Sequence, residues 1–524
     1  MTPISASEIP ASNSPDTEAF RLGAFVDLLR RQAELDVVGE PIDLIDLAAR
    51  LDGNAKAVLF ERAGAEGARL VGNVFGSRKR MALAFDVSER DLSQEVLRRA
   101  NSPISPLVIP SAAAPVHQIV LQGKDADLTK LPVHLQHLED GGPYISAGID
   151  ISRSLDGSKR NVGYRRLMLR GPQEAGVDMI APSDFRIMYA EYIARKERMP
   201  VAFVIGSHPI DAVAATSVST EPDELALMGG LRKSPVPVVR CVSVDLEVPA
   251  DAEIVLEGYL DEKGWAEPEG PYGEYIGYYG RMKTNPVFHL TAITMRRDAL
   301  FQTITIGGRF LGATDTAQLV AIRTEAAVWQ ALRTSISAPV AVYAAPSSGG
   351  QYNVRLSLRQ RHPGDVRNAI YSVLGCNADV KHLFVVDDDI DIFSDAQMDW
   401  AMATRFQANR DIVLGEGFRV VPLDPSLAGS RTGAKAGFDM TFPFGWQNTR
   451  DYAVPEAPRV SATNAKQTVR NALITGPKSF LELMELTGSR DGREIVRELD
   501  VLRKEVGLER AEDGRHKLSK TIGL

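Results

Sequence analysis

The segment YISAGIDISRS, residues 144–154, decides the fold, because it belongs to a series of strand-like runs that fill the middle of the chain. Apolar and β-branched runs separated by turn residues predict strands. The other runs are VHQIVLQG (116–123), YRRLMLRG (164–171), VAFVIG (201–206), VVRCVSVDLEV (238–248), AEIVLEGYL (252–260), PVFHLTAITMRR (286–297) and ALFQTITIGG (299–308). Many strands with few helices indicate a barrel or a strongly curved sheet, which we expect over residues 113–314.

The regions on both sides of this sheet alternate helices and strands. The helical pattern FRLGAFVDLLRRQAEL (20–35) opens a predicted α/β domain over residues 19–112, after a flexible tail of residues 1–18. The pattern TAQLVAIRTEAAVWQALRT (316–334) opens a second α/β domain over residues 315–454. The fold class is therefore mixed α/β (α+β) around a central barrel.

Residues 462–524 form a separate small module in this interpretation. The segment REIVRELDVLRKEV (493–506) places Ile495, Leu499, Leu502 and Val506 on one helical face. LERAEDGRHKLSK (508–520) is typical of a hairpin, so the module resembles a winged helix in outline. It carries 12 Lys or Arg against 10 Asp or Glu from Lys466 onward. Nucleic-acid binding is therefore an alternative role, less favoured than oligomerisation or covering of the active site.

The composition is that of a globular protein without obvious targeting signals. Hydrophobic residues make up 44% and charged residues 24% of the 524, and the net charge is −8, which argues against a mainly polyanion-binding protein. Cys241 and Cys376 are the only cysteines, and neither has a CxxC or zinc-type spacing, which argues against a disulfide framework and a structural zinc site. The N-terminus lacks the features of a signal peptide, and no run is long and apolar enough to span a membrane. We expect a cytoplasmic enzyme.

The string PEGPYGEY, residues 268–275, has the strongest chemical pattern. It places Glu269 and Glu274 on either side of a turn that contains Gly270, Pro271 and Gly273. Glycines allow a sharp bend and a close approach to a ligand, and paired carboxylates suit general acid–base chemistry. On spacing alone, a surface turn with two solvated acids is the simpler interpretation.

Two further strings are ambiguous by themselves. NVGYRRLMLR (161–170) contains Asn161 and Arg166, and PDELALMGGLR (222–232) contains Asp223 and Glu224. Surface positions explain the first pair, and the helix dipole explains acids in the first turn of a helix. Neither string alone indicates a site.

The three strings together resemble the UbiD family of decarboxylases, over roughly residues 20–446. The resemblance rests on the order and separation of N-x-G-x-x-R, DELALMGG and EGPYGE. VPADAEIVLEGYL (248–260), VVDDDID (385–391) and GAKAGFD (433–439) agree with it. It implies non-oxidative, reversible release of CO2 from an aromatic or heteroaromatic α,β-unsaturated acid. The implied cofactor is prenylated FMN in the central split barrel, and Mn²⁺ (or Mg²⁺) and K⁺ hold its phosphate.

The resemblance also assigns residues and partners. Arg166, Glu269 and Glu274 would form the catalytic network, and Asn161 and Glu224 would bind the metal. The cofactor-binding residues would be Ser146, Asn161, Arg166, Ser217, Glu224 and Lys435. A flavin prenyltransferase would supply the cofactor, and the second α/β domain would assemble the chain into dimers or higher multiples.

One position departs from the family pattern. A histidine usually supplies the third metal ligand about twenty residues after the asparagine, and here that stretch reads MIAPSDFRIMY (179–189). Asp184 or Ser183 would have to replace it, and an aspartate oxygen suits magnesium or manganese.

The expected substrate pocket is apolar. The pocket residues would be Ile306, Phe310, Leu311, Phe442 and Phe444. They favour a flat ring system, for example phenazine-1-carboxylate. An alternative from another class is a flavin oxidoreductase that uses ordinary FMN in the same barrel, although no nicotinamide or nucleotide motif is present.

Other candidate positions have simpler explanations. We expect Asp387, Asp388 and Asp389 to cap the helix that follows them. His134 and His137 are expected to be structural or surface residues, and His208, before Pro209, is expected to be a turn residue.

Overall fold

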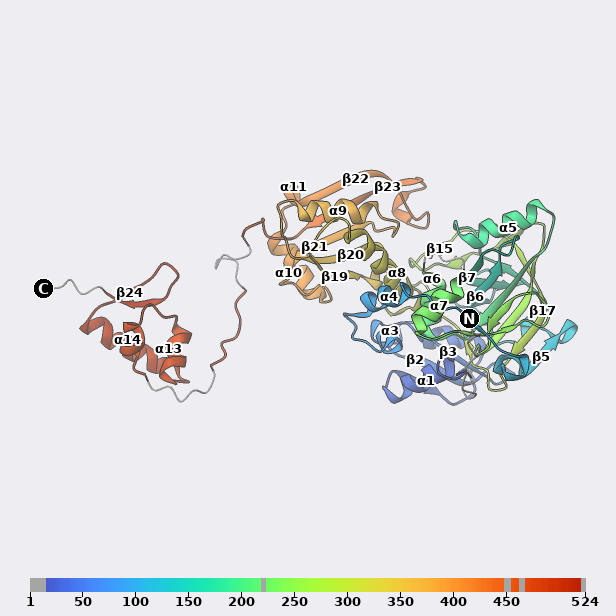
Figure 1. Ribbon diagram of the computed structural model, residues 1–524, viewed down its shortest axis with the longest axis horizontal. Coiled ribbons are helices and arrows are strands. Elements are labelled where there is room, and N and C mark those ends of the chain that lie inside the picture. The colour runs from blue at the N-terminus through green and yellow to red at the C-terminus, as the bar shows by residue number, and fades with distance from the viewer. Residues whose placement is uncertain (1–15, 218–222, 447–453, 461–466, 520–524) are drawn as a thin grey trace, which may run out of the picture. The chain divides into compact units, whose positions relative to one another are not determined.

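Six antiparallel strands close the middle of the chain into a barrel (Figure 1). β12 closes it, because this strand pairs with β9 on one side and with β17 on the other. The strands, in their order around the barrel, are β12 (Ile254–Leu260), β9 (Met199–Ile205), β6 (Tyr144–Arg153), β7 (Arg160–Leu169), β8 (Glu174–Val177) and β17 (Val287–Met295). The predicted barrel is confirmed, and β5 (Ile119–Gln122) adds to it beside β17.

Strand β9 is apolar on both faces, and its contacts show why. Val201, Phe203 and Ile205 pack into one buried cluster with Phe288, whose ring lies 5.0 Å from that of Phe203. Ala202 and Val204, which point the other way, pack into a second cluster with the neighbouring helices. A strand buried on both faces has no polar alternation, which explains the continuous run of apolar residues in its sequence.

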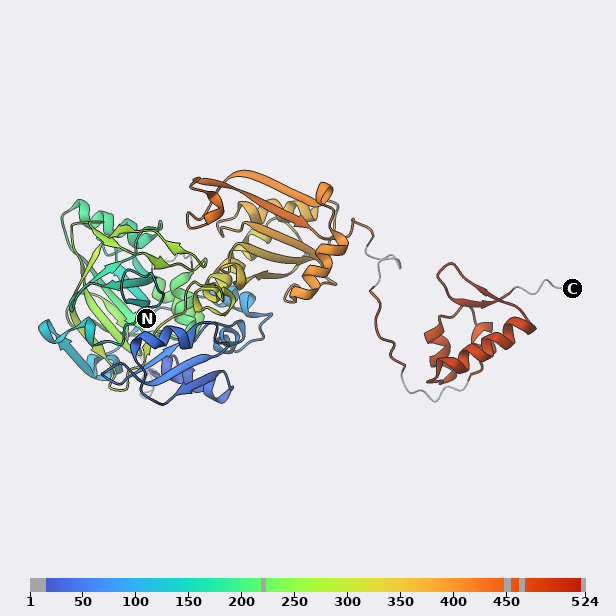
Figure 2. The same ribbon diagram turned by 180° about the vertical axis from the view of Figure 1, so that it is seen from behind.

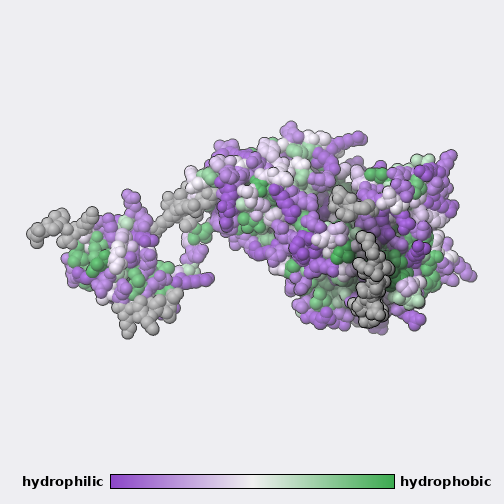
Figure 3. All heavy atoms as spheres, viewed as in Figure 1, coloured by the Kyte–Doolittle hydropathy of each residue, from purple (hydrophilic) through white to green (hydrophobic). Residues whose placement is uncertain are grey.

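The computed structural model describes residues 16–217, 223–446, 454–460 and 467–519. The chain divides into two compact units, Met1–Phe444 and Gly445–Leu524. Most of the predicted tail lies outside the described residues. Among the described residues, no helix is both long and apolar enough to cross a bilayer. Hydrophilic residues cover most of the face seen in Figure 3, with apolar residues scattered among them.

Short elements around the barrel position the residues of interest. Three helices are α5 (Asp184–Ala194), α6 (Pro209–Thr216) and α7 (Glu224–Arg232), and a small sheet contains β4 (Leu107–Val108), β10 (Pro237–Arg240) and β11 (Glu247–Pro249). Two short strand pairs follow β12. They are β13 (Glu267–Glu269) with β16 (Lys283–Asn285), and β14 (Tyr272–Gly273) with β15 (Tyr279–Gly280). His208 is buried and caps α6, so it is a helix cap and not the turn residue that we predicted.

The N-terminal region forms a four-stranded sheet with helices. Its strand order is β1-β2-β3-β18, and β18 comes from the end of the barrel region. The elements are α1 (Leu22–Arg31), β1 (Leu35–Val38), α2 (Leu47–Leu51), β2 (Ala57–Ala63), β3 (Ala68–Gly72), α3 (Arg78–Phe85), α4 (Leu92–Ala100) and β18 (Phe301–Gln302).

The region after the barrel is a five-stranded sheet with order β19-β20-β21-β23-β22, visible in gold and orange in Figure 2. The central strands are parallel, and β19 and β22 run antiparallel at the edges. The elements are α8 (Asp315–Leu332), β19 (Pro339–Ala344), β20 (Asn353–Leu358), α9 (Asp365–Gly375), β21 (His382–Asp387), α10 (Asp395–Arg405), α11 (Ala408–Asp411), β22 (Ile412–Arg419) and β23 (Thr432–Asp439).

The aspartates at the end of β21 and directly after it do not cap α10, so that prediction was wrong. Ser394 caps this helix and accepts a hydrogen bond from the backbone of Gln397. Asp387 instead accepts a hydrogen bond from the backbone of Phe442, at 2.7 Å. Asp389 forms a two-pronged ion pair with Arg405.

The second unit has the predicted three helices and hairpin. They are α12 (Val469–Ile474), α13 (Phe480–Thr487), α14 (Gly492–Glu505), β24 (Leu508–Arg510) and β25 (His516–Leu518). Ile495, Leu499 and Leu502 are buried in its core, as predicted. Val506 is exposed because α14 ends before it, so the prediction for this residue was wrong.

A buried ion pair joins the N-terminal region to α8. The guanidinium of Arg78 donates to the two carboxylate oxygens of Glu325 at 2.7 and 2.9 Å. Glu325 also accepts a hydrogen bond from the backbone of Ala344 in β19, at 3.1 Å. Three segments that are distant in the sequence therefore depend on one carboxylate.

Removing one partner of this pair should be costly, because it leaves the other charge buried without compensation. We expect Glu325→Ala to lower the free energy of unfolding by about 3–5 kcal/mol, measured by urea denaturation. The control is Arg90→Ala, which removes the exposed ion pair of Arg90 with Asp391 and should cost about 1 kcal/mol or less. Equal losses for the two variants would contradict the assigned role of Glu325.

Candidate active site

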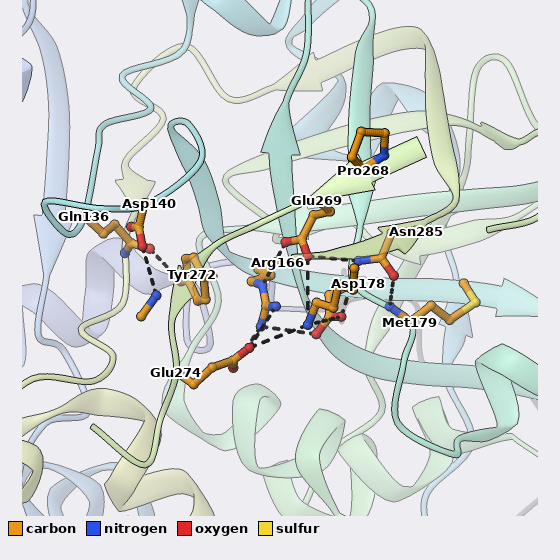
Figure 4. A network of polar contacts seen from close by, with 12 residues as sticks. Gln136, Asp140, Arg166, Asp178, Met179, Pro268, Glu269, Tyr272, Glu274 and Asn285 are labelled. Atoms are coloured by element: carbon orange, nitrogen blue, oxygen red, sulfur yellow. Dashed lines mark hydrogen bonds and ion pairs between the residues drawn. The ribbon is translucent and has the colours of Figure 1, made fainter. Parts of the chain in front are cut away.

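A buried arginine lies among three carboxylates beside the barrel (Figure 4). The Nε atom of Arg166, in β7, donates to Glu269 at 3.3 Å, and Nη1 and Nη2 donate to the two oxygens of Glu274 at 3.2 and 3.1 Å. Nη1 also lies 3.1 Å from Asp178. Burial lowers the pKa of Arg166, but the charges of Asp178, Glu274 and Glu269 outweigh it and raise the pKa well above its ordinary value. The guanidinium therefore stays charged.

The two short strand pairs bring the glutamates to this arginine. Glu269 ends β13, and Glu274 directly follows β14. Between them the backbone of Gly270 has a positive φ of 96°, and a Cβ atom on Gly273 would lie 2.4 Å from the ring of His137. The glycines of the predicted turn are thus required by conformation and by close packing.

Tyr272 supports the guanidinium from one face. Its ring centroid lies 4.2 Å from Cζ of Arg166, which is a cation–π contact. Its hydroxyl donates to Gln136 at 2.6 Å, and its ring lies 4.3 Å from the ring of Tyr144. These contacts restrict the guanidinium to one position.

The sequence did not predict three residues of the cluster, which are Asp178, Lys283 and Asn285. Nζ of Lys283 lies 3.0 Å from Asp178, 3.6 Å from Glu274 and 3.9 Å from Glu269. Asn285 donates to Glu269 at 3.1 Å. Lys283 and Asn285 are two residues apart in one strand, which places them on the same face, and this spacing in KTN was the available signal.

A second set of polar contacts connects the glutamate turn to the segment with Ile306. Asp140 accepts hydrogen bonds from the backbone of Gly273 and of His137, both at 2.9 Å. Nε2 of His137 donates to the carbonyl of Ile306 at 2.7 Å. The structural interpretation of His137 is therefore confirmed.

A cavity of about 250 Å³ lies next to this connection. Its lining includes His134, Gln136, His137, Thr305 and Ile306. Gln136 links the cavity to the arginine cluster, because its side chain accepts from Tyr272 and donates to the carbonyl of Ile304 at 2.9 Å. The cavity has room for a small planar molecule.

The predicted metal ligands gather near the turn between β6 and β7. Glu224 accepts a hydrogen bond at 2.6 Å from the backbone of Val162, the residue after Asn161. Asn161 donates to Asp150 at 2.8 Å, and Asp184 pairs with Lys159 at 2.6 Å. Burial raises the pKa of Glu224 to about 7, and the nearby charge of Asp184 contributes to the shift.

The chemistry of these side chains fits a hard divalent cation. One amide and two carboxylates provide oxygen ligands of the type that magnesium and manganese prefer. Within the described part of the chain, no three His, Cys, Asp or Glu side chains form such a group by themselves. A metal site at these residues would therefore depend on the amide of Asn161 as well as on the carboxylates.

The predicted flavin-binding residues do not all lie together. Ser146 is buried and accepts from the backbone of Ile304 at 3.0 Å, next to the cavity. Ser217 ends α6 and donates to the carbonyl of Val213 at 2.7 Å. Lys435 lies in the five-stranded sheet, where it donates to the carbonyl of Leu374 at 2.9 Å. The structure thus places Lys435 with β23 and α9, and not with Arg166.

The predicted substrate-pocket residues are also divided. Ile306 lines the cavity, but Phe310 and Leu311 are not among the described residues that line it. Phe310 and Phe444 are largely exposed, and the ring of Phe442 lies 4.3 Å from the guanidinium of Arg405. The structure therefore brings only one of the five to the cavity.

Three family models match the chain over most of its length. They describe the N-terminal domain, the Rift-related domain and the C-terminal domain of 3-octaprenyl-4-hydroxybenzoate carboxy-lyase, and match residues 26–100, 108–309 and 317–440.

Solved structures of UbiD-class enzymes agree with this match. HmfF from Pelotomaculum thermopropionicum, in complex with FMN, is 31% identical, with a TM-score of 0.79 over 83% of this chain and 97% of that one. An evolved dimeric form of HmfF with prenylated FMN is 30% identical, with a TM-score of 0.75 over 84% and 97%. The 3,4-dihydroxybenzoic acid decarboxylase of Klebsiella pneumoniae is 26% identical, with a TM-score of 0.76 over 85% and 98%. The chain therefore belongs to the UbiD family of carboxy-lyases.

Proposed function

We propose that this protein catalyses the non-oxidative, reversible decarboxylation of an aromatic or heteroaromatic carboxylic acid, with prenylated FMN as its cofactor. The buried contact of Arg166 with Glu269 and Glu274 is the observation that carries the proposal. The flavins in the HmfF structures support the choice of cofactor.

In the proposed reaction, each residue of the cluster has one task. When bound, prenylated flavin would supply an electron sink for the pair left by the departing CO2. Arg166 attracts and orients the carboxylate of the acid, and Glu269 fixes the position of Arg166. Glu274 then delivers a proton to the carbon that has lost CO2, so that the acid becomes a neutral product with C–H in place of C–CO2⁻.

The cofactor would be held by oxygen ligands and hydroxyls of the barrel region. Asn161, Glu224 and Asp184 would bind Mn²⁺ or Mg²⁺ at the flavin phosphate, together with K⁺. Ser146, Ser217 and Lys435 are the further flavin-binding candidates. Lys435 would have to exchange its hydrogen bond to Leu374 for a new partner.

The proposed partners follow from the cofactor and from the relatives. A flavin prenyltransferase would supply prenylated FMN. A homodimer or a higher homo-oligomer is the proposed assembly, and HmfF is known in an evolved dimeric form.

The proposed substrate is an acid with a flat ring system, and phenazine-1-carboxylate is one candidate. Ile304 and Ile306 give the cavity an apolar side, and Gln136 and Thr305 add polar groups. Such a mixture suits a ring with a few polar substituents.

The proposed function is tested by loading the protein with prenylated FMN and measuring CO2 release from a panel of acids. The panel should include benzoate, 3,4-dihydroxybenzoate and phenazine-1-carboxylate. We expect CO2 release from at least one aromatic acid, and none from protein that carries only FMN. A loaded protein that releases no CO2 from any aromatic acid, and incorporates none at high bicarbonate, would contradict the proposal.

Neutralising the proposed acid should stop product formation without loss of the fold. We expect Glu274→Gln to lower the rate of CO2 release about 10²–10⁴-fold, which is the range for a well-placed general acid. Glu267→Gln is the control, because Glu267 is an exposed glutamate at the start of β13. A Glu274→Gln protein with the normal rate and an unchanged flavin spectrum would refute the assignment.

The third metal ligand can be tested independently of activity. We expect Asp184→Asn to weaken binding of Mn²⁺ about tenfold or more, measured by equilibrium dialysis with metal analysis, because the site loses one anionic ligand. Asp156→Asn, in the exposed turn before β7, should leave Mn²⁺ binding unchanged. Unchanged binding in Asp184→Asn would rule out Asp184 as a ligand.

A further inference from the structure

The carboxylate of Asp178 lies between two cations. Its Oδ2 atom is 3.1 Å from Nη1 of Arg166 (Figure 4). Its Oδ1 atom is 3.0 Å from Nζ of Lys283. The charges of Arg166 and Lys283 outweigh the effect of burial and hold the pKa of Asp178 below its ordinary value. The structure thus shows that one carboxylate fits between this pair of cations.

Arg166 has little capacity for another carboxylate while these contacts persist. Its three nitrogens are already engaged by Glu269, Glu274 and Asp178. Lys283 is different, since its ammonium group has three donors. Only its 3.0 Å contact with Asp178 is within hydrogen-bonding distance, and the contacts to Glu274 and Glu269 are longer, at 3.6 and 3.9 Å. Lys283 is therefore the cation whose ammonium group has donors available for a further carboxylate.

Exposure identifies the side from which a ligand can approach. The side chains of Glu269 and Glu274 are 0% and 6% exposed, whereas those of Lys283 and Asp178 are 20% and 25% exposed. Three carboxylates already surround two cations in this cluster, so a fourth carboxylate would meet a net negative charge. One acid must move away or take up a proton before the fourth carboxylate binds, and Asp178 is the most exposed of the three.

We propose that Asp178 occupies, in the absence of substrate, the position at which the carboxylate of the acid binds between Arg166 and Lys283. Lys283 is then a substrate-binding residue, and Asp178 is a competitor that the substrate displaces. Asn285, whose side chain lies 3.4 Å from Asp178, remains as a hydrogen-bond donor for the displaced carboxylate. The inference deepens the proposed function and rests on it for the class of ligand.

The two residues should have opposite effects on affinity. Lys283→Met removes a charge that pairs with the ligand, so acids should bind more weakly. Asp178→Asn removes the competing charge, so acids should bind more tightly, because the binding-competent state no longer has to exclude a carboxylate. A purely structural role for Asp178 predicts the reverse, since its loss would then loosen Arg166.

The test compares acids with their amides, which have the same ring without the charge. Binding of benzoate, 3,4-dihydroxybenzoate and phenazine-1-carboxylate, and of the matching amides, is measured by calorimetry on the full-length, cofactor-loaded protein. We expect Lys283→Met to weaken acid binding about tenfold or more and Asp178→Asn to tighten it about threefold or more, with amide binding little changed. Lys283→Arg should restore most of the acid affinity.

The control variant is Lys381→Met. Lys381 is similarly ion-paired, 2.7 Å from Asp424, and 26% exposed, but it lies in the five-stranded sheet region. The Lys381→Met substitution should therefore leave acid binding unchanged. A melting temperature for each variant separates loss of the site from loss of the fold, and Lys283→Gln replaces Lys283→Met if the latter fails to fold.

The inference and the proposed function fail in different ways. The inference is overturned, even where CO2 is released, by any one of three results. Lys283→Met binds acids as tightly as the parent protein, Asp178→Asn binds acids more weakly than the parent, or the parent binds acids no more tightly than amides. If the expected pattern of binding appears but no acid loses CO2, the carboxylate site stands and the proposed function fails.

Discussion

Burying the guanidinium of Arg166 is the constraint on which the site depends. A buried charge is costly unless oppositely charged groups and hydrogen bonds surround it. The three carboxylates that do so come from the segment after β8, from the end of β13 and from the residue after β14. The barrel fixes Arg166, and the two short strand pairs fix the glutamates. The requirement of one cation thus determines how three parts of the chain meet.

The same requirement explains the residues around the cluster. Tyr272 covers one face of the guanidinium, and Asn285 satisfies the oxygen of Glu269 that Arg166 leaves free. A partly satisfied polar network costs more than an apolar core, so each added acid needs a donor. Lys283 meets this need for Asp178. The cluster retains three acids for two cations, which is an expensive arrangement for stability alone and is typical of a functional site.

The sequence predicts the parts of this site that lie in short strings, and misses the parts that depend on long-range pairing. Glu269 and Glu274 are separated by one turn with glycines, and Arg166 lies five residues after Asn161 in the same strand. Lys283 reaches Glu269 only because β16 pairs with β13, and this register cannot be read from three residues of strand. Asp178 belongs to the cluster because β8 ends at Val177, beside Arg166. The barrel itself is predictable because the middle of the chain contains many strand-like runs separated by turn residues.

The errors have equally local causes. Ser394 caps α10 because its backbone is extended directly before the helix, and the three aspartates at the end of β21 and directly after it lie too early to do so. Val506 follows the last turn of α14, so helical spacing no longer places it on the buried face. Both errors concern where a helix begins or ends, and periodicity gives little information about ends.

The position of Asp184 changes the electrostatics of the proposed metal site. A histidine there would be a neutral ligand, whereas aspartate adds a second carboxylate beside Glu224 and makes the ligand set entirely oxygen. Lys159, 2.6 Å from Asp184, offsets that charge when no cation is bound. Oxygen ligands of this charge bind hard cations such as Mg²⁺ and Mn²⁺ most tightly, and they bind softer metals that prefer imidazole less tightly. With Asp184 as the proposed third ligand, the site should favour hard cations such as Mg²⁺ and Mn²⁺ over softer metals.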